Sequence, residues 1–361
     1  MTDLSNPDQV RQAKSRCTRE LMLDFQGLSC RVLADNQPVI ELLRDYFAGL
    51  TAEARAPVIQ DIYLVDAEPD ISAIEWAPVR RAKTRPPGLK EAYADAPGGR
   101  WIHKVRTGMV MFQSLSDPMA IGKLMENACQ VVNFINNQFL NHHQRQGCLL
   151  GHASAFTMAG ETTAIAASSG GGKSTLMLRA LETEGVRFLS NDRILFRSAA
   201  GQTDILGLAK HPRVNPGTLL HSERLATLLS GSERARYSTM PRDQLWEIEQ
   251  KHDVLIPRLF GEGKTELSGR LKNLVLLDWA LDSAKATDLT RVDTVQDPGA
   301  LEGLRKNPGP FYQDRTGCFP AAESPGSDIY ARNLQGVRVW RLTGSIDFDR
   351  AATLLAAGGI L

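Results

Sequence analysis

A short glycine-rich segment in the middle of the chain has residue types suited to binding phosphate. Residues 167–174 read A-S-S-G-G-G-K-S. The three glycines let the backbone turn so that consecutive N–H groups face phosphate oxygens. Lys173 can then reach the β and γ phosphates of a nucleotide, and the Ser174 hydroxyl is placed to ligate Mg²⁺. The segment departs from the G-x-x-x-x-G-K-[ST] pattern only at Ala167, a small residue that still permits a tight turn.

The flanking residues predict the strand, loop and helix that a triphosphate site requires. Residues 162–167 are apolar and compatible with a strand, and residues 173–184 are good helix formers. Gly185 suits the left-handed position that ends a helix, and residues 186–189 begin a second strand. This order favours a P-loop over a glycine-rich turn that merely precedes a helix. The residues expected to bind the nucleotide are Ser168, Ser169, Gly170, Gly171, Gly172, Lys173, Ser174 and Thr175.

A carboxylate is expected where the second strand ends. Asp192, preceded by Asn191, occupies that position. Mg²⁺ needs more than one protein oxygen near the γ phosphate, so Ser174 and Asp192 are the predicted metal ligands. An Asn-Asp turn after a strand is the structural alternative. Asp278, which closes the apolar run 274–277, is a rival carboxylate.

Three segments together resemble the C-terminal domain of HPr kinase/phosphorylase, the bacterial enzyme that phosphorylates a serine of the phosphocarrier protein HPr. They read H-A-S-A at 152–155, S-S-G-G-G-K-S at 168–174 and V-R-F-L-S-N-D at 186–192. In that family a histidine precedes the P-loop lysine by the interval that separates His152 from Lys173. The family's P-loop domain is similar to that of phosphoenolpyruvate carboxykinase. The resemblance covers roughly residues 148–280 and implies an ATP-dependent kinase.

The resemblance also implies roles for particular residues. Arg270, in G-R-L-K-N-L, is similar to a P-G-R-N-L segment of the family and would stabilise the transferred group, so the expected catalytic residues are Asp192, His152 and Arg270. Where the family has two aspartates this chain has Asn191 and Asp192, and an amide has no useful basicity. Either Asp192 is both metal ligand and base, or His152 takes the proton. Asp204, in D-I-L-G-L, would be an acceptor-side carboxylate.

A basic loop follows the segment of weaker resemblance. Lys210, His211 and Arg213 lie in A-K-H-P-R-V-N-P-G, a stretch opened and closed by prolines. The loop is either a phosphate clamp or a solvated surface loop, and the residues leave both interpretations open.

The leading hypothesis is ATP-dependent, Mg²⁺-assisted transfer of the γ-phosphoryl group to a hydroxyl, with a serine of an HPr-like or other protein as acceptor. One alternative is a nucleotide-sensing module without transfer activity, and another is a small-molecule kinase. A transporter ATPase is disfavoured because Arg270 replaces a signature glycine in L-S-G-R and no Glu follows Asp278. A GTPase is disfavoured because the chain has no N-K-x-D.

Length and composition limit the remaining choices. The chain of 361 residues is long enough for two domains, and we expect an N-terminal α+β domain at 1–146 and a P-loop domain with a mixed sheet at 147–361, an α/β protein overall. A formal net charge of +1 supplies no global field for nucleic acid. The apolar runs are too short to span a membrane, the N-terminus does not resemble a signal peptide, and the five cysteines are scattered, so we expect a cytoplasmic protein. A homo-oligomer is possible, since the family resembled forms rings.

Overall fold

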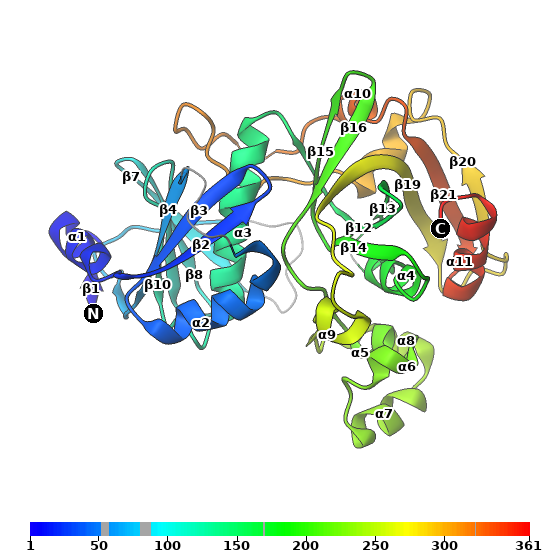
Figure 1. Ribbon diagram of the computed structural model, residues 1–361, viewed down its shortest axis with the longest axis horizontal. Helices are drawn as coiled ribbons and strands as arrows, with labels where there is room; N and C mark the ends of the chain where they lie inside the picture. Colours follow the sequence, from blue (N-terminus) through cyan, green and yellow to red (C-terminus); the bar gives the residue numbers. More distant parts are fainter. Residues whose placement is uncertain (52–57, 80–87, 169, 322) are drawn as a thin grey trace. The chain divides into compact units, whose positions relative to one another are not determined.

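The protein forms two compact units (Figure 1). The computed structural model describes residues 1–51, 58–79, 88–168, 170–321 and 323–361. Unit 1 contains Met1–Gln146 and Pro308–Glu323, and unit 2 contains Gly147–Asn307 and Ser324–Leu361. The sequence predicts a single P-loop domain over 147–361, whereas in the structure Pro308–Glu323 packs with unit 1. Asn141 Nδ2 donates a hydrogen bond to the Phe311 carbonyl at 2.8 Å, and the Phe311 ring lies 6.3 Å from that of Phe134.

Unit 1 is built on an eight-stranded mixed sheet in the order β2-β3-β4-β10-β9-β8-β7-β6. β3 and β4 are parallel, as are β4 and β10, and the other neighbours are antiparallel. The strands are β2 (Arg19–Phe25), β3 (Leu28–Ala34), β4 (Gln60–Asp66), β6 (Ala77–Pro78), β7 (Glu91–Ala96), β8 (Gly99–Lys104), β9 (Met109–Ser114) and β10 (Met119–Gly122). The helices are α1 (Pro7–Ser15), α2 (Gln37–Tyr46) and α3 (Ala128–Arg145), and β1 (Thr2–Asp3) pairs with β5 (Pro69–Asp70).

Local patterns predicted part of unit 1. Residues 21–33 alternate apolar and polar side chains, which predicts a hairpin with its turn at Gly27. The hairpin is present as β2 and β3, with its turn at Gln26 and Gly27, both of which have positive φ. The apolar residues within 118–146 recur at helical spacing, which predicts one helix over that stretch. The helix begins only at Ala128, because the buried apolar residues 119–122 form β10. A short apolar run of this kind is compatible with either a strand or a helix, and its pairing partners decide between them.

Unit 2 is an α/β structure with a nine-stranded mixed sheet, as the sequence predicted. Its main order is β11-β15-β16-β19-β13-β12-β14, with β21 on β19 and β20 on β21. β13–β19 and β19–β21 are parallel pairs, and the remaining pairs are antiparallel. The strands are β11 (Leu149–Gly151), β12 (Ala153–Met158), β13 (Glu161–Ala166), β14 (Val186–Ser190), β15 (Ile194–Ala199), β16 (Gln202–Gly207), β19 (Ser268–Ala280), β20 (Asp288–Arg291) and β21 (Arg338–Ser345).

Both faces of this sheet are covered, because successive strand residues point to opposite sides. Val275 of β19 joins an apolar cluster with α4 (Lys173–Ala180) and α11 (Phe348–Ala357), whereas its neighbours Leu274 and Leu276 join a cluster with η2 (Pro298–Gly303) and α10 (Ser327–Asn333). Figure 1 shows α4 and α11 close together beside the strands. Helix α4 is thus held against one face of a sheet whose opposite face is also covered at β19.

A helical insertion separates two short strands of unit 2. β17 (Arg213–Val214) pairs with β18 (His252–Asp253), and α5 (Pro216–Leu219), α6 (Glu223–Ala226), α7 (Gly231–Ser238) and α8 (Arg242–Trp246) lie between them, followed by α9 (Ile256–Phe260). Figure 1 shows this group of helices next to α4. None of the helices in the described ranges combines the length and the apolar character needed to cross a bilayer.

Candidate functional site

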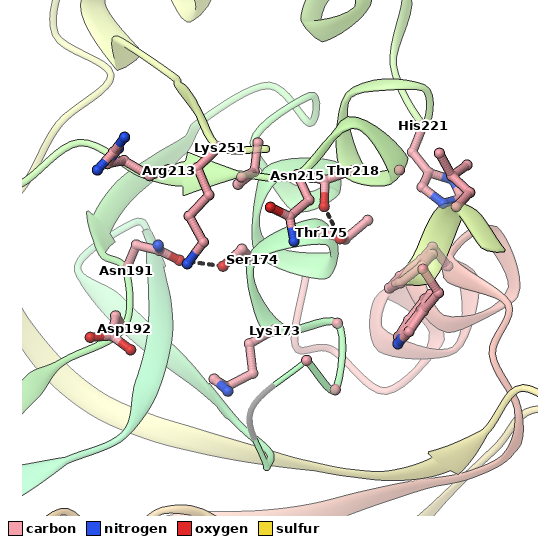
Figure 2. A pocket seen from close by; sticks show the side chains of 18 of the residues that line it. Lys173, Ser174, Thr175, Asn191, Asp192, Arg213, Asn215, Thr218, His221 and Lys251 are labelled. Atoms are coloured by element: carbon pink, nitrogen blue, oxygen red, sulfur yellow. Dashed lines mark hydrogen bonds between the residues drawn. The ribbon is translucent and has the colours of Figure 1, made fainter. Parts of the chain in front are cut away.

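A cavity of about 390 Å³ lies in unit 2 where α4 begins. Its wall comes from the P-loop, the turn after β14, the β17 segment, the helical insertion and the start of α11 (Figure 2). Among the described residues, five cationic side chains line it: Lys173, Lys210, Arg213, Arg242 and Lys251. Asp192 is the one carboxylate of that described lining. Such a charge balance favours a polyanionic ligand.

The P-loop adopts a conformation that depends on its glycines. Gly170 and Gly172 have φ of 81° and 89°, in the left-handed region that residues with a Cβ rarely adopt. A Cβ on Gly171 would lie 2.8 Å from that of Ala167, so a small residue at 167 and a glycine at 171 are required together. Gly170, Gly171 and Gly172 line the cavity, whereas Ser168 is exposed and is absent from its described lining. Ser169 lies outside the described residues.

Lys173 is the first residue of α4 and is only 7% exposed. Its Nζ donates hydrogen bonds to the carbonyl oxygens of Ala167 and Ser168, each at 3.0 Å. Burial lowers the pKa of Lys173 to about 8, partly against the favourable charge of Asp192. The ammonium group therefore lies inside the loop, within reach of any phosphate that the loop binds.

The lowered pKa of Lys173 predicts pH-dependent nucleotide binding. Phosphate binding favours the charged ammonium, and this form is lost as pH rises through about 8. Because the protonated fraction falls from about half at pH 8 to about a tenth at pH 9, ATP affinity should fall about fivefold over that interval and roughly tenfold for each further pH unit. Isothermal titration calorimetry from pH 7.5 to 9.5 measures this change. The control is Lys173→Arg, whose guanidinium stays charged and should remove the dependence. A constant affinity in the unaltered chain would contradict the prediction.

Asn191 makes hydrogen bonds to two hydroxyl groups. Its Oδ1 accepts from Ser174 Oγ at 2.7 Å and from Ser154 Oγ at 2.8 Å. Figure 2 shows the contact with Ser174 at the N-terminal end of α4. The amide thus orients the predicted metal-binding hydroxyl instead of supplying a base.

Asp192 and His152 form a pair at the edge of the cavity. His152 Nε2 lies 3.3 Å from Asp192 Oδ1, and Arg193 Nε lies 3.6 Å from Asp192 Oδ2. Partial burial raises the pKa of Asp192, but the hydrogen bond from His152 and the charges of Lys306 and Arg193 outweigh this effect and hold the pKa below its usual range. Burial lowers the pKa of His152, which leaves the ring neutral at pH 7. A carboxylate and a neutral imidazole therefore face the phosphate-binding loop.

Arg270 does not lie with these residues, contrary to its expected catalytic role. β13 and β19 are parallel, and Arg270 pairs with Glu161 at the start of β13, whereas the P-loop follows Ala166 at its end. Five residues of strand span about 17 Å. Asp204 pairs with Arg270 across β16 and β19, so it lies at the same distant end. The parallel register excludes both from the cavity wall.

The rival carboxylate Asp278 lies at the correct end of β19 but not on the correct face. Its neighbour Trp279 points toward the P-loop and donates a hydrogen bond from Nε1 to the Gly171 carbonyl at 3.0 Å. Strand alternation therefore directs Asp278 to the opposite face, where Arg341 Nε lies 4.0 Å from its Oδ2. Asp192 is the carboxylate placed to act beside the P-loop.

The cavity brings together basic residues that the sequence singled out and basic residues that it did not. Lys210, His211 and Arg213 of the basic loop do line the cavity, as a phosphate clamp requires. Arg242, the first residue of α8 in the helical insertion, and Lys251, just before β18, join them there. Lys306 lies near enough to influence the pKa values of His152, Lys173 and Asp192. The lone basic residues at 242, 251 and 306 carry no motif, so only the folded chain reveals them.

The oxygen groups at the cavity suit Mg²⁺ bound jointly with phosphates. In the described part of the chain no group of three or more His, Cys, Asp or Glu side chains could hold a metal ion. The available oxygens are the Ser174 hydroxyl, the Asn191 carboxamide and the Asp192 carboxylate. Mg²⁺ prefers such oxygens and commonly takes one or two protein ligands together with substrate phosphates and water. Ser174 and Asp192 would hold it here.

Comparison with known proteins leaves the family open. No protein-family model matches the sequence, and no curated protein matches it. Among solved structures, the chain is similar to the Hpr(Ser) kinase/phosphatase from Coxiella burnetii, with 12% identity, a TM-score of 0.30, and coverage of 58% of this chain and 90% of that one. Membership in the HPr kinase family stays a prediction, and the function proposed below depends on the cavity itself.

Proposed function

We propose that the protein is an ATP- and Mg²⁺-dependent kinase related to HPr kinase, which transfers the γ-phosphoryl group to a serine hydroxyl of a partner protein. One observation carries the proposal: the P-loop, the Asp192–His152 pair and a set of cationic side chains line the same cavity. A phosphate-binding loop alone would suit any nucleotide-binding protein. A carboxylate and a neutral imidazole next to it supply the groups that a hydroxyl acceptor needs.

The chain's own residues have separate tasks in this reaction. The glycine N–H groups and Lys173 bind the phosphates. On binding, the hydrogen bonds from Lys173 Nζ to the Ala167 and Ser168 carbonyl oxygens are replaced by hydrogen bonds to phosphate oxygens. Bound Mg²⁺ would supply charge neutralisation on the β and γ phosphates. The acceptor hydroxyl loses its proton to the Asp192–His152 pair as its oxygen bonds to the γ-phosphorus, and ADP leaves with the oxygen that bridged the β and γ phosphorus atoms. Catalysis arises mainly from positioning and charge stabilisation.

Proton acceptance belongs to the pair because neither member is suited to it alone. The pKa of Asp192 lies below its usual range, which makes that carboxylate a weak base. His152 is neutral at pH 7, and Asp192 beside it stabilises the imidazolium that proton uptake creates. Kinase activity should therefore decline on the acid side, as His152 becomes protonated.

A nucleotide-sensing module without transfer activity is the second candidate. Asn191 favours this candidate, because the HPr kinase family has an aspartate at the matching position and an amide has no useful basicity. In this chain the amide accepts hydrogen bonds from Ser154 and Ser174. The sensing module predicts ATP binding without label transfer, and gain of transfer by Asn191→Asp would support it.

Transfer from γ-labelled ATP tests the proposal. The purified chain is incubated with Mg²⁺, labelled ATP and either a protein extract or a metabolite extract, and phosphosites are mapped by mass spectrometry. We expect label on serine of one or a few proteins. Label only in the metabolite fraction would replace the protein acceptor by a small molecule. If ATP binds but no label is transferred in either extract, the kinase proposal fails and the nucleotide-sensing module is favoured.

A further inference from the structure

The cavity has two ends of different chemical character. Asp192 and Asn191 lie at one end and His221 at the other (Figure 2), the Phe348 ring lies 4.8 Å from that of His221, and Trp246 also lines the cavity. Figure 2 shows Asp192 and His221 on opposite sides of the view, with Lys173 between them. In the proposed reaction the γ phosphate must lie near Asp192. The rest of the nucleotide then extends past Lys173 toward the aromatic end.

The aromatic end is rigidly attached to the P-loop. The Phe348 ring lies 5.3 Å from that of Trp279 and 4.8 Å from that of His221, both edge to face. A Cβ on Gly172 would lie only 3.0 Å from the Phe348 ring, so the loop and the ring are in close contact. Trp279 is itself hydrogen-bonded to the Gly171 carbonyl. A ligand at the loop therefore meets a preformed apolar wall.

The helical insertion closes this end of the cavity and is anchored to α4. Thr218 Oγ1 of α5 lies 2.8 Å from Thr175 Oγ1 of α4, and Ser222 Oγ donates to Glu182 Oε1 at 2.6 Å. Arg242, at the start of α8, donates from Nη2 to the Ile346 carbonyl at 2.5 Å. These contacts hold α8, which carries the half-buried Trp246, beside the start of α11.

Asn215 supplies a side-chain oxygen with no hydrogen-bond partner among the described residues. It precedes α5 as the N-cap residue, where an asparagine side chain ordinarily accepts a backbone N–H, but here it makes no such hydrogen bond. Its Oδ1 is buried without a hydrogen-bond partner, and the residue lines the cavity. Figure 2 shows its carboxamide near Thr218. Buried polar atoms are nearly always paired, so this carboxamide keeps hydrogen-bonding capacity that a ligand in the cavity could use.

We infer that this end of the cavity binds the nucleoside half of the nucleotide. The base lies against Trp246 and the His221–Phe348 pair, and Asn215 makes a hydrogen bond to the base or the sugar. The inference rests on the proposed function, because the position of the γ phosphate beside Asp192 sets the direction of the nucleotide. The helical insertion thereby becomes part of the nucleotide site, and the acceptor approaches from the Asp192 end.

The test compares ATP with inorganic tripolyphosphate, which has the phosphates but no nucleoside. Calorimetry with Mg²⁺ should show that the unaltered chain binds ATP more tightly than tripolyphosphate. Stacking of one base on an aromatic side chain is typically worth a ten- to hundredfold affinity difference, so Trp246→Ala should weaken ATP binding by about that factor. Asn215→Ala should weaken ATP binding about five- to tenfold. Neither change should alter tripolyphosphate binding more than about twofold, since both spare the P-loop.

Phe260→Ala is the matched control, because Phe260 is a half-buried aromatic residue of α9 that is absent from the described cavity lining. It should leave both ligands unaffected. Equal affinity of the unaltered chain for ATP and tripolyphosphate would overturn the nucleoside pocket while leaving the phosphate site intact. If both Trp246→Ala and Asn215→Ala bind ATP as tightly as the unaltered chain does, the nucleoside pocket is likewise overturned. Failure of the unaltered chain to bind either ligand would instead remove the proposed function.

Discussion

Replacing Lys173 by alanine should lower the affinity for Mg²⁺·ATP on the order of a hundredfold and bring phosphoryl transfer below detection. The change removes charge-assisted hydrogen bonds to phosphate, which are each worth roughly 1.5–3 kcal/mol. It also removes the charge that stabilises the transferred group, so kcat should fall more than binding alone explains. Calorimetry and label transfer, measured on the same preparation, separate the two effects.

Lys272→Ala is the control for this loss of charge. Lys272 Nζ lies 3.9 Å from Glu161 Oε1 at the start of β13, the end of the strand away from the P-loop. Its replacement should leave ATP affinity and transfer within about twofold of the unaltered chain, because distant sites act independently. Undiminished transfer by Lys173→Ala would remove the assignment of this loop as the phosphate site.

Asp192→Asn should reduce transfer by about 10²- to 10⁴-fold, the range associated with loss of a positioned proton acceptor. Asp192 has φ of 73°, a left-handed conformation that aspartate and asparagine tolerate better than alanine does. The amide therefore removes the charge without adding backbone strain. Binding of ATP without Mg²⁺ should stay within a few-fold, because the P-loop is unchanged, and the gain in affinity on adding Mg²⁺ should shrink.

The Asp278→Asn variant decides between Asp192 and Asp278 as the reactive carboxylate, a choice that the sequence alone left open. Asp278 is exposed, lies on the other face of β19 and is absent from the described cavity lining, so its replacement should leave transfer within about twofold. A large loss of transfer in Asp278→Asn with little loss of transfer in Asp192→Asn would reverse the assignment.

His152→Gln should lower phosphoryl transfer and flatten the acid side of the pH profile of transfer. A histidine with a merely structural role would leave the shape of that profile unchanged.

Local sequence determined the backbone structure of the proposed phosphate site almost completely. The order of strand, glycine loop and helix is present at β13, residues 167–172 and α4, and Asn191 and Asp192 follow β14 as expected. These features follow from short-range physics: glycine permits positive φ, the helix formers after Lys173 begin a helix, and strand ends present polar side chains. All of these features lie within residues 161–192, so their prediction does not depend on a distant part of the chain.

Tertiary structure alone decided which distant residues join that site. Arg270 and Asp278 both belong to β19, but the parallel register with β13 and the alternation of side chains exclude both of them from the cavity. Asn215, Trp246 and Phe348 enter the cavity from segments without a motif, because the helical insertion and α11 pack beside α4. Register and helix packing depend on contacts between residues up to about two hundred positions apart, and a local pattern carries no information about such contacts.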